Sequence, residues 1–181
     1  MNLLRAIAGE SVTRRRDREL QAGGDYATSD QFCRIFQKDM LGLYLLAFLL
    51  TASHEHAEQC FLLGMGDALK ERKVFKEWAS SWSRRLVIKN AIHLIADSST
   101  ESREQPDCWI EANDESTMGA TINVLTQLDS FDRTVFVMSV LERYSEHECA
   151  LLLGCSTRDI HAARIRALQE LPALYAATAA G

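Results

Sequence analysis

The sequence has few of the residues that interrupt helices. Only two prolines and nine glycines occur among its 181 residues. Proline lacks a backbone N–H and glycine favours turns, so a chain with little of either is expected to be helical almost throughout. We therefore predict an all-α fold.

Recognisable catalytic and metal-binding patterns are also missing. The five cysteines form no CxxC pair and leave one over, which favours reduced thiols, mostly in the core. Two groups of side chains could supply nitrogen and sulfur ligands, but neither has a zinc spacing: His54, His56 and Cys60, and His147, Cys149 and Cys155. No serine–histidine–acid or paired-carboxylate arrangement stands out. We predict a non-enzyme with neither metal nor cofactor.

No apolar run is long enough to cross a bilayer. The longest, Leu41 to Ala52, holds about a dozen residues where a span needs about 20. At the N-terminus the arginines Arg14 to Arg16 follow the apolar residues, the reverse of a secretory signal. The expected location is cytoplasmic.

Basic residues are not in excess overall, but charge is unevenly distributed. The net charge is −5, yet residues 31–96 carry nine Lys/Arg against six Asp/Glu, and residues 97–117 carry seven acids against one arginine. This division predicts two small helical modules joined by an acidic linker. The expected boundaries are an N-terminal arm (1–30), a basic module (31–96), the linker (97–117), a second module (118–172) and a tail (173–181).

The first module contains three aromatic residues among several cations. Phe75, Trp78 and Trp82 have the i, i+3, i+7 spacing of a buried helical stripe, which favours a core role. The alternative is that they stack on the bases of single-stranded nucleic acid, because lysines and arginines surround them.

The second module contains the local signals of a helix-turn-helix. Ser145 with Glu148 three residues later forms a capping-box pattern, and Ser156 with Asp159 repeats it. Gly154 suits the turn between the two helices. The apolar stretch Phe131 to Leu141 is expected to form the preceding helix.

A helical wheel separates two faces of the last helix. Ile160, Ala163, Ala167 and Leu171 fall together and should pack inward. The outer face is formed by Arg158, His161, Ala162, Ile165 and Gln169, with Arg166 beside it. In a DNA-reading helix such residues meet base edges and phosphates, although an ordinary helical hairpin has the same pattern.

At this point the chain resembles the extracytoplasmic-function (ECF) sigma factors of bacterial RNA polymerase. The upstream-promoter module of that family is similar to the run from Ser145 to Ser156. The similarity includes Arg133 before this run and Arg166, Ala167 and Leu171 after it. The stretches FCRIF, LYLLAFLLTASHEHAEQ and WSRRLVIKN are similar to its polymerase-binding and promoter-melting region. After Ala57-Glu58 the chain departs from the family with apolar Phe61 to Leu63, and after Asn90 it lacks the usual basic residues.

The resemblance implies a transcription initiation factor with three sets of contact residues. Core RNA polymerase would bind at Glu58, Gln59, Leu62 and Leu63. Melted promoter DNA would bind at Lys73, Lys76, Trp82, Arg84, Arg85, Lys89 and Asn90. The upstream promoter element would bind at Thr157, Arg158, His161, Ala162, Ile165 and Arg166.

Further partners and functions remain open. An anti-sigma factor is a possible partner, and the acidic linker is either a mimic of a nucleic-acid strand or a plain tether. The departures favour an alternative function, a degenerate sigma-like protein that binds polymerase or a regulator without promoter-specific initiation. A simple DNA-binding repressor fits less well, because it would not need the first module.

Overall fold

A computed structural model describes residues 24–71, 73–98 and 117–179. These residues form helices joined by short turns: α2 (Ser29–Lys38), α3 (Met40–Thr51), α4 (His54–Lys70), the 3-10 turn η1 (Lys76–Trp78), α5 (Ala79–Ser98), α6 (Thr117–Gln127), α7 (Ser130–Phe136), the π-helical η2 (Val137–Leu141), α8 (Glu146–Leu153) and α9 (Thr157–Ala179). Within the described ranges no strand occurs, although Tyr26 and Phe75 form one isolated antiparallel bridge. The all-α prediction is confirmed.

Local capping explains where the first helices begin and end. Thr28 and Gln31 form a reciprocal capping box at the start of α2. Ala52 ends α3 in the left-handed conformation, and the Ser53 hydroxyl accepts a hydrogen bond from the His56 N–H at the start of α4. These caps satisfy backbone groups that have no partner within the helix.

Helices α4 and α5 approach each other closely at Gly64. A Cβ atom at this position would lie 3.0 Å from the Val87 Cγ2 atom and 3.3 Å from the Val87 backbone nitrogen. Glycine therefore allows the two helices to pack at a distance that any side chain would increase. Helix α3 packs against both through its buried leucines.

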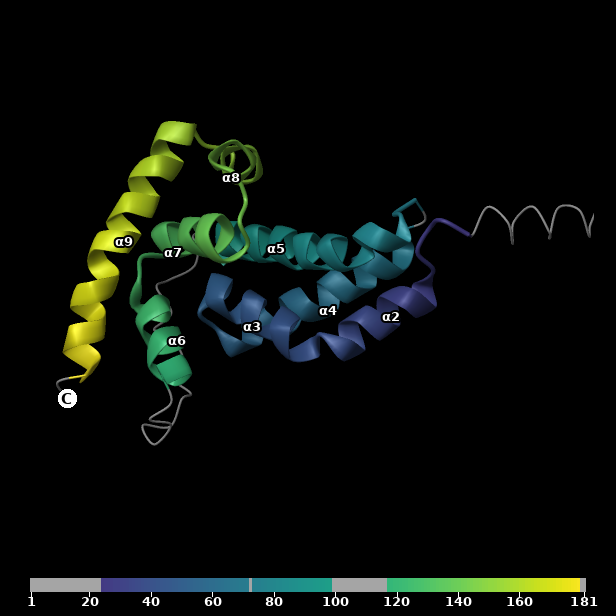
Figure 1. Cartoon of the computed structure of the whole chain (residues 1–181), viewed down its shortest axis with the longest axis horizontal. Coiled ribbons are helices and arrows are strands. Elements are labelled where there is room, and N and C mark those ends of the chain that lie inside the picture. Colours follow the sequence, from purple (N-terminus) through teal and green to yellow (C-terminus); the bar gives the residue numbers. More distant parts are fainter. Residues whose placement is uncertain (1–23, 72, 99–116, 180–181) are drawn as a thin grey trace, which may run out of the picture.

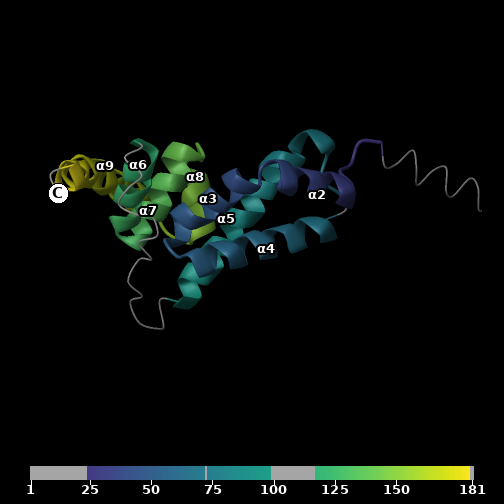
Figure 2. The ribbon, with the colours of Figure 1, turned by 90° about the horizontal axis from the view of Figure 1, so that it is seen from below.

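The helices fall into two groups that contact each other. Helices α2–α5 form one group and α6–α9 the other, and α9 runs across the end of the molecule in Figure 1. Figure 2 shows the molecule from below, with α4 along one side of the first group. Buried residues of both groups belong to one hydrophobic cluster, with α3 contacting α6, α7 and η2. The two groups therefore share one hydrophobic core. The domain boundaries given in the sequence analysis stay a prediction.

A buried arginine joins the two groups. Arg133 of α7 is 5% exposed, and its Nε and Nη2 atoms each donate to the Leu50 carbonyl near the end of α3, at 3.4 Å. Its Nη1 atom donates to the carbonyls of Leu128 at 2.9 Å and Thr126 at 3.3 Å. Burial lowers the pKa of Arg133 to about 10, because the cation has lost most of its water. The carbonyl oxygens replace that water.

Two elements differ from the sequence-based expectation. The stretch expected as one helix from Phe131 to Leu141 is α-helical only to Phe136 and continues as the π-helical η2. Helix α9 continues past Pro172 to Ala179, where a tail was expected after the proline. Packing of Leu171 and Leu174 against the core accompanies this extension.

Two predicted segments lie mostly outside the described residues. The N-terminal arm is described only from Gly24, where Asp25 and Ala27 form backbone hydrogen bonds with Lys76 and Val74. The acidic linker is described only at its ends, where α5 stops at Ser98 and α6 starts at Thr117. In the described parts of the chain, no helix combines the length and apolarity that a membrane span requires.

Candidate nucleic-acid interface

Helices α8 and α9 form the predicted helix-turn-helix. The Ser145 hydroxyl accepts from the Glu148 N–H at 3.2 Å, and the Glu148 carboxylate accepts from the Ser145 N–H at 2.9 Å. Ser156 and Asp159 repeat this arrangement at 3.2 and 3.1 Å at the start of α9. Gly154 between them has a φ of 65°, the left-handed conformation that glycine adopts most easily. The turn geometry is confirmed, including both reciprocal caps.

The two faces of α9 also follow the helical wheel. Ile160, Ala163 and Ala167 are fully buried, whereas Arg158 and His161 are exposed. Thr157 and Ile165 are likewise exposed, and Ala162 is half-buried. The N-terminal part of the outer face is therefore open to a partner. Whether that partner is a promoter stays a prediction.

Carboxylates of neighbouring helices contact His161 and two of the arginines of α9. Glu146 of α8 contacts His161 at 3.1 Å and Arg164 at 3.2 Å. Glu146 is the first residue of α8, so this contact directs the half-buried Arg164 toward α8. The same contact holds α8 and α9 at a fixed orientation.

Arg166 is held by a buried acid. Its Nε and Nη2 atoms donate to the two carboxylate oxygens of Asp132, at 2.8 and 2.6 Å, and the Asp132 side chain is only 4% exposed. Hydrogen bonding to Asp132 raises the pKa of Arg166. One edge of this guanidinium therefore orients α9 on α7. The side chain is half exposed, so its other edge faces solvent.

The residues predicted to bind melted DNA lie on α5 and on the segment before it. Four of their cations are exposed: Lys73, Lys76, Arg85 and Lys89. Asn90 instead donates to the Leu86 carbonyl at 2.9 Å and to Asp67 of α4 at 3.3 Å, so it ties α5 to α4.

The aromatic residues of this region do not form one core stripe. Trp82 packs against the core and its buried indole N–H has no partner among the described residues. Trp78 is 58% exposed, so the core interpretation is wrong for this residue. Phe75 lies between Tyr26 and Trp78, with ring centroids at 4.8 and 5.2 Å. Trp78 thus offers an exposed face suited to stacking.

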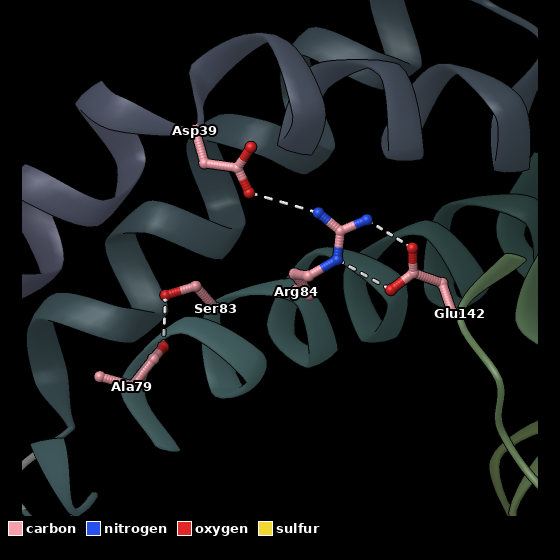
Figure 3. Close-up of polar contacts among 5 residues, drawn as sticks. All are labelled: Asp39, Ala79, Ser83, Arg84 and Glu142. Carbon is pink, nitrogen blue, oxygen red and sulfur yellow. Dashed lines mark hydrogen bonds and ion pairs between the residues drawn. The ribbon is translucent and has the colours of Figure 1, made fainter. Parts of the chain in front are cut away.

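Arg84 differs from the other cations because acids surround it, as Figure 3 shows. Its Nε atom donates to Oε2 of Glu142 at 2.8 Å, and its Nη2 atom contacts the other carboxylate oxygen. The Nη1 atom donates to Asp39 at 3.3 Å. These hydrogen bonds, above all those from Glu142, raise the pKa of Arg84. Ser83, the residue before Arg84, is buried, and its hydroxyl donates to the Ala79 carbonyl. Arg84 lies beside this buried position, on the flank of α5.

The predicted polymerase-binding residues share the outer face of α4. Glu58, Gln59, Leu62 and Leu63 are all exposed, and the two leucines are 53% and 43% exposed. Ala57 and Cys60 face the core instead. The four residues are thus accessible together, as a protein-binding surface would require.

Three acids that shape this region were not predicted from the sequence. Asp132 is an acid within the apolar stretch Phe131 to Phe136, which could have indicated a buried partner. Glu142 and Glu146 have no comparable local signal, because their partners lie on other helices. Across the ranges that the structure describes, no three His, Cys, Asp or Glu side chains gather as a metal site would require.

A solved structure has a similar arrangement of helices. It is the co-crystal structure of the sigma factor RpoE in complex with the anti-sigma factor NepR from Bartonella quintana. The fold resembles that of a sigma factor. The TM-score is 0.50 at 18% sequence identity, and the match covers 79% of this chain and 95% of the solved one. No protein-family model matches the chain, and neither does any curated protein.

Proposed function

We propose that this protein is a transcription initiation factor of the ECF sigma type. It binds core RNA polymerase through the outer face of α4, reads the upstream promoter element with α9, and captures melted promoter DNA along α5. The observation that carries the proposal is the doubly capped helix-turn-helix whose reading face, at Arg158 and His161, is exposed. The likeness in fold to a sigma factor supports it.

The division of labour on α9 follows from its contacts. Arg158 and His161 lie in the first two turns, the part of a recognition helix that reaches base edges in the major groove. Arg158 has five N–H donors, is exposed, and binds no carboxylate among the described residues, so it is suited to a bidentate contact with guanine. Arg166, held by Asp132, is suited to a phosphate contact through its exposed edge.

Transcription with purified core polymerase tests the proposal. Arg158→Ala should abolish or greatly reduce run-off transcripts, with a loss of about 1–3 kcal/mol in specific binding if it reads a guanine. The control is Lys38→Ala, which removes the same charge from an exposed site at the end of α2. Equal transcript levels from the two variants would contradict a reading role for α9.

The polymerase-binding surface has its own matched pair of variants. Leu62→Asp should reduce capture by immobilised core polymerase, because it places a charge in an apolar contact. Leu151→Asp on α8 makes the same change at a leucine that is 69% exposed and outside the α4 face. Similar losses in both variants would indicate non-specific hydrophobic adhesion.

A second candidate function is a sigma-like protein that holds polymerase or a regulator without initiating. The observation that favours it is that Arg84 and Arg166 both bind carboxylates of the same chain. Polymerase capture without run-off transcripts would support this alternative. The sigma factor of similar fold is bound to an anti-sigma factor, and a partner of that kind is part of either proposal.

A further inference from the structure

Arg84 belongs to the first group of helices, but its strongest contacts come from the second. Glu142 follows η2, 58 residues later in the chain, and its backbone N–H donates to the Val137 carbonyl at 2.9 Å. Its side chain is 11% exposed, compared with 32% for Arg84. A carboxylate from outside the module thus lies on the N-terminal third of the predicted DNA-binding helix.

This contact is a bidentate arginine–carboxylate pair, and arginine binds phosphate in the same manner. Two neighbouring N–H groups of Arg84, on Nε and Nη2, bind the two oxygens of one carboxylate (Figure 3). Arginine binds the two free oxygens of a phosphate with the same fork. The other Nη1 nitrogen donates to Asp39, which belongs to the first group itself. A phosphate could take the bidentate edge only if Glu142 left it.

The segment from Glu142 to Glu148 also lies close to Arg85, the residue after Arg84. Burial raises the pKa of Tyr144, and the Arg85 charge partly opposes that rise. Arg85 also helps lower the pKa of Glu148, after the larger effect of the hydrogen bonds from Ser145. The segment from Glu142 to Glu148 therefore faces both arginines of α5.

We propose that Glu142 occupies a phosphate-binding position on Arg84, so that closure of α6–α9 onto α2–α5 and binding of a single DNA strand on α5 exclude each other. The proposal rests on the proposed function, since it concerns the same α5 surface. It adds that the structure is the closed state of the protein, in which an internal anion takes the place of the strand. Opening frees Arg84 and exposes Arg85 further.

Two carboxylates on one guanidinium provide a matched control. Glu142→Gln and Asp39→Asn each remove one negative charge beside Arg84. Only Glu142 links the two groups of helices, because Asp39 lies at the junction of α2 and α3. A general charge effect would therefore appear in both variants, and competition with closure only in the first.

The test measures binding of a fluorescein-labelled oligo-dT to the full chain by anisotropy, without polymerase. Glu142→Gln should bind about tenfold more tightly than the natural sequence, the effect of freeing one charge-assisted contact. Asp39→Asn should change affinity by less than about threefold. Adding Arg84→Ala to Glu142→Gln should remove the gain and reduce the log–log salt slope by about 0.7, the contribution of one phosphate on a single strand.

Small-angle scattering on the same samples follows closure directly. The radius of gyration should increase in Glu142→Gln and stay unchanged in Asp39→Asn. Circular dichroism establishes that each variant is folded, and Glu142→Asp, one methylene shorter, serves if Glu142→Gln is not. Equal affinities in the Glu142 and Asp39 variants, or a gain that persists without Arg84, would overturn the proposal.

The proposed function can fail separately from this inference. If Glu142 variants open and bind oligo-dT through Arg84 but no promoter is transcribed, the competition stands and the initiation role falls. If transcription depends on Arg158 but Glu142→Gln changes neither affinity nor size, the initiation role stands and the competition falls.

Discussion

The two glycines of α4 should respond in opposite ways to the same substitution. Gly64 faces α5, where an added Cβ would lie 3.0 to 3.4 Å from atoms of Val87. Two of those atoms are backbone, and a helix backbone cannot move aside as a flexible side chain can. At Gly66 no atom lies within 4 Å of the added Cβ.

The magnitudes follow from helix propensity and packing. Alanine gains about 0.8–1 kcal/mol over glycine inside a helix, and this gain applies at both positions. Overpacking at Gly64 costs about 1–3 kcal/mol, which equals or exceeds the gain. We expect Gly66→Ala to stabilise the fold by about 1 kcal/mol and Gly64→Ala to destabilise it by up to about 2 kcal/mol.

Urea unfolding followed by far-UV circular dichroism measures this difference. The free energies of unfolding should differ by about 1–3 kcal/mol between the two variants, which corresponds to about 2–12 °C in Tm for a chain of this length. Both variants replace a glycine of α4 by alanine, so the gain in helix propensity is the same in both and cancels in the comparison. Gly64→Ala as stable as Gly66→Ala would refute the close approach of α4 and α5.

Three further outcomes are expected from single substitutions. Ser145→Ala should lower the free energy of unfolding by about 1 kcal/mol, because it removes the N-cap of α8. Urea denaturation measures this loss, with Ser80→Ala as the control at an exposed serine that is not an N-cap. Hydrogen bonds from Ser145 lower the pKa of Glu148, so its contribution is present above the unfolded pKa of about 4.3 and lost as pH falls through the folded pKa. The free energy of unfolding should therefore fall less on acidification in Glu148→Gln than in the natural sequence, with Glu170→Gln as the comparison. Burial raises the pKa of Cys60 to about 12, so mass spectrometry after brief alkylation at neutral pH should find it unmodified while half-buried Cys33 reacts; comparable labelling of both thiols would contradict this burial.

Features set by neighbouring residues were predictable from the sequence. Each cap of the helix-turn-helix joins two residues that are three positions apart, Ser145 with Glu148 and Ser156 with Asp159. Gly154 marks the turn between them, so the spacing alone predicts the motif. The buried face of α9 followed from periodicity for the same reason.

Features that depend on distant partners were not predictable. Arg133 and Leu50 are 83 residues apart, and Arg84 and Glu142 are 58 apart, so no local pattern links them. Periodicity assigned Trp78 to the core, but it cannot detect that η1 interrupts the helical spacing before α5 begins. Likewise, a continuous apolar run gave no sign that η2 would depart from α-helical hydrogen bonding.

The π-helical turn makes chain length part of the Arg84 site. In η2 the backbone hydrogen bonds span five residues instead of four, as in that from Glu142 to Val137. Removing one residue, such as Ser139, would allow an ordinary α-helix, and each residue of such a helix accounts for about 100° of rotation. The hydrogen bond from Glu142 to Val137 would then span four residues, one ordinary helical turn, so Glu142 would keep its side of the helix axis. A deletion within η2 should therefore keep this contact, whereas a deletion within α7 would turn Glu142 by about 100° and break it.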